Sequence, residues 1–347
     1  MKILLGMSGG LDSTYAAHLL TEAGHEVTGA LLVTSGCTDE RAAVLSAAEA
    51  GVPLVTLDAR ERFDRSVVAP FVDEYLRART PNPCVLCNPA VKFGLLCEYA
   101  EEHGFDRAAT GHYAAIGEEN DRFFVKKALD PAKDQGYVLW RLTQKQLSML
   151  HFPLSGLKKT DVRAEARRLG YSAAEAKDSQ EICFIPDNDH ARFIEEYTGK
   201  KPKPGDFLDK NGKIVGKHRG IVHYTVGQRK GLGIALGEPV FVTRIDPEAN
   251  TVTVAPAGNE FSAGMKISGM SFQKTVLAAG DTLSCLVKVR YAAPPVPAEV
   301  RMETADRASV VFSSPVRAVT PGQSAVFYDE NGDLLFGGLI DGGENAE

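Results

Sequence analysis

The sequence lacks an apolar run of membrane-spanning length, and it starts with a short strand-like segment rather than a secretion signal. We therefore expect a cytoplasmic protein with no membrane partner. Basic residues number 39 against 45 acidic ones, and the net charge of −6 excludes a uniformly basic protein that wraps nucleic acid, although not a locally basic face. Charged residues make up 24% and hydrophobic residues 44% of the 347 residues, so the chain is not disordered as a whole and about two to three domains are expected.

Cysteine is also scarce, with six residues in the chain. Disulfide frameworks belong to oxidising compartments, so we expect these thiols to be reduced and to bind a metal or act in catalysis. Cys97 and Cys285 lie within helix and strand patterns, where burial is the expected role. Cys37 has no motif around it.

The arrangement of apolar runs divides the chain. Up to about residue 115, expected strands at 3–5, 27–33, 53–57 and 107–110 alternate with expected helices at 13–23, 39–50, 61–77 and 93–103. This alternation predicts a parallel sheet covered on both faces. Residues 143–200 are mostly helical in pattern, with helices expected at 160–168, capped by Thr160, and at 189–198, starting at Asp189.

From about residue 201 glycine and proline become frequent and the apolar runs become short. Expected strands at 240–245, 251–255, 284–291, 309–312 and 325–328 predict one or two small antiparallel β domains. The tail after Tyr328 carries six acidic residues and no basic one, so we expect it to be solvated.

The strongest local signal is the glycine loop Ser8-Gly-Gly-Leu-Asp-Ser13, between the first expected strand and helix. Its glycines let the backbone approach a ligand, and the free N–H groups at the helix start attract anions. It lacks the G-K-S/T of a Walker loop and the dinucleotide pattern G-x-G-x-x-G. It resembles the pyrophosphate loop of ATP-pyrophosphatases, which implies cleavage of ATP to AMP and pyrophosphate. Asp12 beside a triphosphate needs a screening cation, so we expect Mg²⁺.

Two further strand ends are expected at the same crevice, because ligands of open parallel sheets gather at the carboxyl ends of strands. Leu32 ends the second strand and is suited to pack on adenine. Gly111 follows the strand at 107–110 and leaves room for a nucleotide. His112 beside it can hydrogen-bond phosphate or ribose, although a capped loop histidine is an equally good interpretation.

Two cysteine motifs are candidates for metal binding or redox chemistry. Cys84 and Cys87 form a Cys-x-x-Cys motif after Thr80-Pro-Asn-Pro, where the prolines restrict the backbone. Cys183 follows the polar run 178–181. A Cys-x-x-Cys motif alone is compatible with structural zinc, a redox pair or cluster ligands, so these alternatives stay open.

Taken together, the motifs resemble the tRNA-specific 2-thiouridylase family, in the family's order and over nearly the full chain. The matching motifs are SGGLDS at 8–13, TPNP at 80–83, CN at 87–88, ATGHY at 109–113, KDQ at 133–135, DSQ at 178–180, ICF at 182–184 and YTVGQRKG at 224–231.

The resemblance implies that the C2 oxygen of the wobble uridine of tRNA is replaced by sulfur at the expense of ATP. It also implies the fold: an α/β, parallel-sheet ATP-pyrophosphatase (adenine nucleotide α-hydrolase-like) domain with a helical tRNA-binding extension over 1–200, a central β domain over 201–262 and a C-terminal β-barrel over 263–347. A sulfur donor protein or hydrosulfide would supply the sulfur, and we expect a monomer.

Residue roles follow from the same resemblance. Cys87 would be the nucleophile and Cys183 the persulfide carrier. ATP would be held by Gly6, Met7, Ser8, Gly9, Gly10, Leu11, Asp12, Ser13, Leu32 and Gly111. The flipped uracil would be surrounded by Asn82, Pro83 and Cys84. The other tRNA contacts would be His112, Lys133, Asp134, Gln135, Arg290, Tyr291 and Gln323.

The chain departs from the family at two places. Many members carry Asp at the position of Cys84, and a thiol is a poor substitute for a carboxylate in acid–base chemistry. The segment 34–41 is also shorter than in many members, which alters how that side of the site is covered.

The third thiol leaves two mechanisms open. In a persulfide relay Cys183 carries the sulfur and Cys87 attacks it to release the product. In a cluster mechanism Cys84, Cys87 and Cys183 hold an iron–sulfur cluster with one iron open to hydrosulfide, since full ligation takes four thiolates. The cluster is slightly favoured because a relay needs only two thiols. Structural zinc, which needs a fourth ligand, and an aerobic disulfide between Cys87 and Cys183 are the remaining alternatives.

The charge distribution favours an RNA partner. Residues 199–231 contain nine Lys or Arg and two Asp, a local balance of +7. Solvated lysines are the simpler interpretation, but His218, His223, Tyr224 and Arg229 are interleaved with these charges, as in RNA-binding surfaces. Further basic residues precede this segment: Lys158, Lys159, Arg163, Arg167, Arg168 and Lys177.

Two other functions remain to be compared with tRNA thiolation. A different ATP-pyrophosphatase, such as a small-molecule synthetase or amidotransferase, would share the glycine loop but would have no use for Cys87, Cys183 and a basic β extension. A non-catalytic RNA-binding protein with structural zinc would need a fourth ligand and would not turn over nucleotide.

Overall fold

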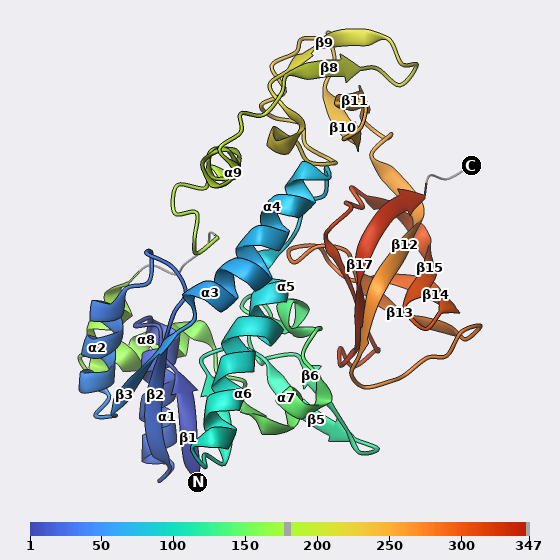
Figure 1. Cartoon of the computed structure of the whole chain (residues 1–347). Helices are drawn as coiled ribbons and strands as arrows, with labels where there is room; N and C mark the ends of the chain where they lie inside the picture. Colours follow the sequence, from blue (N-terminus) through green and yellow to red (C-terminus); the bar gives the residue numbers. More distant parts are fainter. Residues whose placement is uncertain (177–181, 345–347) are drawn as a thin grey trace.

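A computed structural model describes residues 1–176 and 182–344 (Figure 1). The motif residues Asp178, Ser179 and Gln180, and the basic Lys177, lie outside the described residues. No helix within the described ranges is both long enough and apolar enough to span a membrane.

The N-terminal part is built on a five-stranded sheet in the order β3-β2-β1-β4-β7, and all of its pairs are parallel. Four strands were expected from the sequence: β1 (Lys2–Gly6), β2 (Glu26–Val33), β3 (Leu54–Asp58) and β4 (Arg107–Thr110). The two-residue β7 (Leu150–His151) was not expected, because it is too short to give a pattern. The predicted parallel sheet is thus confirmed.

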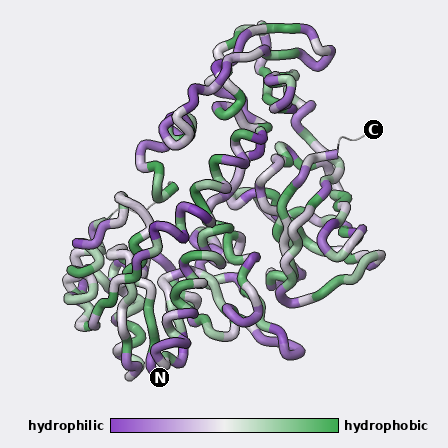
Figure 2. Tube along the Cα trace, in the orientation of Figure 1, coloured by the Kyte–Doolittle hydropathy of each residue, from purple (hydrophilic) through white to green (hydrophobic). Residues whose placement is uncertain are grey.

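Helices cover this sheet, and Figure 2 shows hydrophobic residues along its strands. They include α1 (Leu11–Glu22), α2 (Glu40–Glu49), α6 (Phe93–Glu102) and α8 (Lys159–Arg168). Helix α8 has Lys158, not Thr160, at its N-cap, so it starts two residues earlier than expected. The expected helix at 61–77 is one continuous stretch made of α3 (Arg60–Phe63), a π-helical segment (Asp64–Val68) and α4 (Ala69–Leu76).

Beyond these helices lie a hairpin and the helical region. The hairpin consists of β5 (Ala115–Glu119) and β6 (Arg122–Lys126). After it come α7 (Gln144–Met149) and α9 (His190–Thr198), which begins after Asp189 as expected because the Asp189 carboxylate accepts a hydrogen bond from the Arg192 N–H. In Figure 1 the stretch α3–α4 runs from the parallel sheet toward the small sheet that follows α9.

That small sheet has four strands in the order β10-β11-β8-β9: β8 (Gly205–Leu208), β9 (Ile214–His218), β10 (Val240–Asp246) and β11 (Thr251–Pro256). The pair β11–β8 is parallel, so the sheet is mixed and not purely antiparallel as expected. A long crossover, which contains the glycine-rich residues 219–239, is what permits a parallel pair in so small a unit.

The C-terminal part is a closed six-stranded barrel, as predicted. Its strands are β12 (Phe261–Phe272), β13 (Thr282–Lys288), β14 (Val296–Thr304), β15 (Arg307–Arg317), β16 (Ser324–Tyr328) and β17 (Leu334–Glu344). Closure leaves no exposed edge to pair with other chains.

The expectation of a solvated tail after Tyr328 is wrong. Residues 334–340 of β17 form an apolar run in which Phe336 and Ile340 are fully buried in the barrel core, whereas Leu334 is fully buried in the core cluster of the first domain. The acidic Asp333 is also buried, and Lys274 offsets its charge through a 2.7 Å ion pair. The acid count concealed this strand because the acidic residues lie on either side of the apolar run.

Candidate functional site

The glycine loop connects β1 to α1 at the carboxyl end of the sheet. Gly9 has φ +80, and a Cβ there would lie 2.5 Å from the backbone of Ala42 in α2, so only glycine fits. Gly10 is the N-cap of α1 and provides no side chain to cap the helix. The Ser13 hydroxyl donates to the Gly10 carbonyl at 3.0 Å and accepts from the Ser8 N–H at 3.3 Å. The loop is therefore polar and held by its own hydrogen bonds. Together with the free N–H groups in the first turn of α1, it is suited to bind an anion.

Asp12 in this loop has a cationic partner within the protein. Lys159, at the start of α8, places its Nζ 2.6 Å from each carboxylate oxygen of Asp12. The Tyr113 hydroxyl donates to Asp12 Oδ1 at 3.0 Å. Lys159 is only 8% exposed. The sequence grouped Lys159 with the basic residues of an RNA-binding surface, and that placement is wrong, because the ammonium is buried against the loop carboxylate.

The strand end at Gly111 faces the same loop. A Cβ on Gly111 would lie 2.7 Å from the Asp12 carbonyl carbon, so the β4 end and the first turn of α1 are in backbone contact. Leu32 is half-buried at the end of β2 and packs on the two core clusters that flank it. Gly6 to Ser13, Leu32 and Gly111 thus gather at the carboxyl edge of the sheet, where nucleotides bind in open parallel sheets.

His112 turns inward from this edge. Its Nδ1 lies 2.8 Å from the Thr110 hydroxyl, and its ring packs against Phe93 and Phe152. Burial, and then the charge of Lys92, lowers the pKa of His112 well below its ordinary value. The neutral ring is 8% exposed, so in this structure it is a core side chain and does not present a surface for phosphate or tRNA.

The thiol helix, α5 (Pro83–Cys87), carries the Cys-x-x-Cys motif. Asn82 caps it by accepting a hydrogen bond from the Cys84 N–H at 3.1 Å, and Pro83 occupies the first position, where its missing N–H has no cost. Cys84 is exposed and Cys87 is half-buried. A π-helical segment (Asn88–Lys92) then joins the thiol helix to α6.

The three thiols lie within electrostatic range of one another. Burial raises the pKa of Cys87 to about 11; Lys92 counteracts this, whereas Cys84 and Cys183 add to it. The pKa of Cys183 is also raised, first by desolvation from nearby protein atoms and then by Cys84, although part of its side chain reaches solvent. Cys37 acts on Cys183 in the same direction. The structure therefore brings the two motifs together.

Lys92 and Cys37 are two residues that sequence reasoning missed. Lys92 is the cation common to Cys87, Cys183 and His112. Its position five residues after Cys87, in a continuous helical stretch, was the available signal. Cys37 has no comparable signal, because its proximity to Cys183 depends on the fold alone.

The arrangement of donors fits magnesium better than an iron–sulfur cluster. Within residues 1–176 and 182–344, no three His, Cys, Asp or Glu side chains are grouped so that they could hold a metal ion. Cys84, Cys87 and Cys183 are all described, and they do not form such a group, so the cluster has no ligand set here. Magnesium needs fewer protein ligands, since one carboxylate plus substrate phosphates is a usual ligand set. Asp12 can supply that carboxylate.

Tyr291 and Gln323, two of the residues expected to contact tRNA, bond across a junction between the barrel and the first domain, whereas the bonds of Gln135 to Tyr113 and of Arg290 to Thr320 lie within a single domain. The Tyr291 hydroxyl donates to the Asp134 carbonyl at 3.1 Å, and Gln135 Oε1 accepts from the Tyr113 N–H at 2.9 Å. Arg290 donates to the Thr320 hydroxyl at 2.6 Å. Lys133 follows the hairpin in the same loop and is half-exposed. Gln323 Nε2 donates a hydrogen bond to the Thr80 carbonyl at 2.7 Å.

The basic segment 199–231 divides into an exposed and a buried part. All nine of its Lys and Arg residues are exposed. His218 and Tyr224, however, are buried at 2% and 4% exposure and pack with Phe207 inside the small sheet. The expectation that these two rings would contact RNA is wrong, since the small unit needs them for its core.

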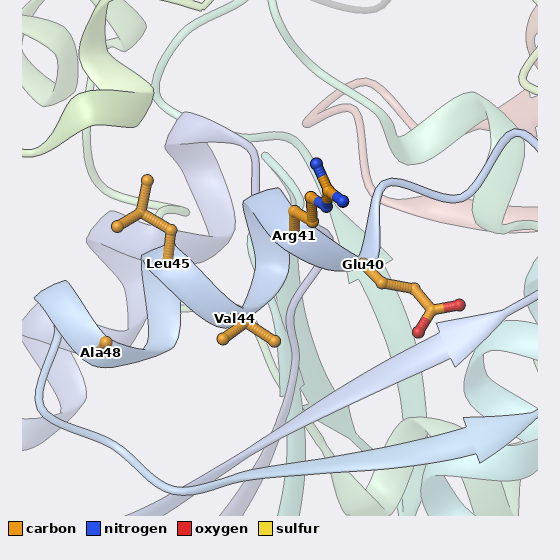
Figure 3. Close-up of a pocket in the computed structure, with 5 residues that line it drawn as sticks. All are labelled: Glu40, Arg41, Val44, Leu45 and Ala48. Carbon is orange, nitrogen blue, oxygen red and sulfur yellow. The ribbon is translucent and has the colours of Figure 1, made fainter.

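A pocket lies on the outer side of α2, away from this constellation. Figure 3 shows its lining by Glu40, Arg41, Val44, Leu45 and Ala48. None of the site residues predicted from the sequence contributes to it. The pocket is therefore not the nucleotide site.

Profiles of three families match successive parts of the chain. Residues 1–187 match the tRNA methyl transferase HUP domain, residues 191–256 the tRNA methyl transferase PRC-barrel domain, and residues 262–340 the aminomethyltransferase beta-barrel domain.

Curated relatives that carry the name tRNA-specific 2-thiouridylase MnmA match nearly the whole chain. The protein from Acetivibrio thermocellus is 44% identical over 356 residues, covering 98% of each chain. That from Clostridium perfringens is 42% identical over 353 residues, again covering 98% of each. That from Geobacter metallireducens is 42% identical over 358 residues, covering 98% of this chain and 96% of its own. A solved 4-thiouridine synthetase–RNA complex with bound ATP has a TM-score of 0.35 at 18% identity, over 56% of this chain and 50% of that one, which is too low to support an inference.

Proposed function

Because the chain belongs to the tRNA-specific 2-thiouridylase family, we propose that it thiolates the wobble uridine of tRNA at C2 in an ATP-dependent reaction. As a member of that family it is a tRNA sulfurtransferase. The observation that carries the finer proposal is the placement of two halves of the chemistry in one molecule: an anion-binding loop at Gly9 and Gly10, and a thiol helix whose Cys87 lies within electrostatic range of Cys183.

The first half-reaction is adenylation. The C2 oxygen of a uridine flipped out of the RNA attacks the α-phosphorus of ATP, the new P–O bond forms, and pyrophosphate leaves. The N-terminus of α1 and the loop from Ser8 to Ser13 would receive the phosphates. Asp12, oriented by Lys159 and Tyr113, would be the carboxylate available to Mg²⁺, which when bound would screen the phosphate charge.

The second half-reaction is sulfur transfer through a persulfide relay. A persulfide-bearing donor protein first places a sulfur atom on Cys183. The terminal sulfur attacks C2 and AMP leaves with the former C2 oxygen. Cys87, as thiolate, then attacks the Cys183 sulfur, so that the RNA leaves with its C2–sulfur group and a Cys87–Cys183 disulfide remains. A dithiol reductant must then restore both thiols.

The geometry supports the relay over the cluster mechanism, because two thiols suffice for it and no described donor group suits a cluster. Cys84, exposed at the start of the thiol helix, is not needed in the relay. Asn82, Pro83 and Cys84 are then proposed to border the uracil. Lys133, Asp134 and Arg290–Tyr291 are proposed to face the tRNA from the junction with the barrel. The domain bounds at 200 and 262, and the monomeric state, stay predictions.

The proposed function has a direct test in nucleoside analysis. Purified protein is incubated with unmodified tRNA, ATP, magnesium and either a persulfide donor or sulfide, and the digested nucleosides are separated by mass. We expect 2-thiouridine at the wobble position only when ATP and sulfur are both present, with one pyrophosphate released per modified residue. Pyrophosphate release that needs no tRNA would instead identify a small-molecule ATP-pyrophosphatase.

The exposed basic segment is expected to hold the tRNA. Replacing Arg229 and Lys230 by alanine should weaken tRNA binding about tenfold and make its salt dependence shallower by roughly one to two in log–log slope, since fewer counterions are released. Titrations at several salt concentrations give both numbers. The matched control removes two exposed arginines of the barrel, Arg301 and Arg307, which lie outside the segment. Equal affinity and slope for the two double variants would show that the basic segment is merely solvated.

A further inference from the structure

One turn of the barrel touches the segment that leads into the thiol helix. The Thr80 N–H donates to the Pro321 carbonyl at 2.8 Å, and Gln323 Nε2 donates to the Thr80 carbonyl at 2.7 Å. Gly322 lies between them with φ +88, and a Cβ on it would lie 2.9 Å from the Thr80 nitrogen. The barrel and the residues that lead into the thiol helix are therefore in backbone contact. The contact is so close that residue 322 has no space for a side chain.

The opposite end of the thiol helix is also held. Asn88 directly follows Cys87, is 2% exposed, and donates from Nδ2 to the Val138 carbonyl at 2.9 Å. Val138 belongs to the 3₁₀ helix η3 (Gly136–Leu139). A buried amide of this kind is costly to leave without its partner, so the contact fixes the helix end.

The η3 helix is in turn held by the barrel. The Tyr137 hydroxyl and Trp140 Nε1 donate to the carbonyl and hydroxyl oxygens of Ser324 at 2.8 and 2.9 Å. Both aromatic rings are fully buried. Ser324 follows Gln323 directly, so the contacts that hold the two ends of the thiol helix converge on neighbouring residues of the barrel.

The thiol helix is the first part of a longer helical stretch, which continues through the π-helical segment into α6. The Cys-x-x-Cys turn lies at the N-terminal end of that stretch, and helix ends fray unless they are held. The contacts at Thr80 and Asn88 therefore limit how far this turn can move. We propose that barrel residues 321–324 position the thiol helix for sulfur transfer, an inference that rests on the proposed function. The barrel is then part of the reaction machinery and not an RNA-binding surface alone.

Two glycines of the barrel permit a matched experiment. Gly322 has φ +88 and would collide with Thr80 on gaining a Cβ, whereas Gly280 has φ +93 and nothing within 4 Å. Gly322→Ala and Gly280→Ala thus introduce the same backbone strain, but only Gly322→Ala displaces Thr80 and the thiol helix that follows it. The free protein is alkylated with iodoacetamide and Cys87 modification is followed by mass. The kcat and KM of tRNA thiolation are measured in parallel.

We expect Gly322→Ala to be alkylated at Cys87 about tenfold faster than Gly280→Ala, because the displaced helix opens more readily. We also expect its kcat to fall about tenfold with a KM for tRNA within about twofold of wild type, which separates positioning from RNA binding. Equal alkylation and equal kcat in the two variants would overturn the proposal, and so would a raised KM with an unchanged kcat.

A second variant covers the case in which Gly322→Ala does not fold. Gln323→Leu removes the donor to the Thr80 carbonyl without backbone strain. Its alkylation is measured without tRNA, so a lost RNA contact cannot affect the result, and wild-type alkylation would overturn the proposal. If wild-type protein yields no thiolated tRNA, the proposed function fails, whereas the alkylation contrast still decides whether the barrel positions the helix.

Discussion

Pyrophosphate release in the presence of tRNA is expected to fall about a hundredfold when Lys159 is replaced by methionine, a loss of the size seen when a preorganised charged group is removed from a transition state. The Lys159 ammonium is 2.6 Å from both oxygens of Asp12 and buried, so it holds the carboxylate in one orientation at the start of α1. Without it, Asp12 would lose the cation that fixes its orientation.

Neighbouring residues supply the controls for this prediction. Lys158 is adjacent and exposed, so Lys158→Met removes the same charge without touching Asp12 and should keep wild-type pyrophosphate release. Asp12→Ala should abolish release while leaving tRNA binding largely intact. Lys159→Met should also lower the free energy of unfolding by about 1–3 kcal/mol, because a partly buried carboxylate loses its partner. Undiminished release by Lys159→Met would contradict the role given to the ion pair.

Thiolation, but not adenylation, should be lost in the variants Cys87→Ser and Cys183→Ser. Serine cannot carry a persulfide or attack one, whereas the glycine loop, proposed to bind the phosphates, is unchanged. We expect at least about a thousandfold less 2-thiouridine with pyrophosphate release retained. Cys97→Ser is the matched control, since Cys97 is a buried thiol whose pKa is also raised to about 11. Cys84→Ala should keep most of the activity in a relay and lose it in a cluster mechanism.

The same thiols have a defined pH dependence. A raised pKa stabilises the neutral thiol, so at pH 7 Cys87, with a pKa of about 11, is almost entirely protonated in the free protein. Alkylation of Cys87 should therefore speed up about tenfold per pH unit from pH 7 to about pH 10, as the thiolate fraction does. A plateau near pH 8.5 would show an ordinary exposed thiol and contradict the burial of Cys87.

The fold of the first domain was predictable because its signals are local. Strands such as β4 and helix starts such as Asp189 follow from short apolar runs and capping side chains. Strand β17 was missed for a reason that is also local: acidic residues on both sides concealed its apolar run. A charge count over the whole tail does not distinguish the buried apolar residues of the strand from the acidic residues on either side. The count therefore led to the wrong expectation of a solvated tail.

Only those parts of the candidate site that lie in short sequence motifs were predictable. The glycine loop and the two cysteine motifs were found because each is a run of special residues. The ion pair of Lys159 with Asp12 joins residues 147 apart, and the contact of Gln323 with Thr80 joins residues 243 apart. A single sequence carries no pattern for such pairs. Lys159 in particular looked like one of several basic residues, and only its burial distinguishes it.

The position of β17 in the barrel has a consequence for the order in which the protein is made. This strand pairs with β12 and β16 and closes the barrel, and Ile340 within it bonds to Gly322 and Gln323. The parallel sheet can assemble while later segments are still on the ribosome, but the turn at 321–323 acquires its shape only after residue 340 has been translated. A nascent chain would therefore form its glycine loop well before the barrel contact at Thr80 is made.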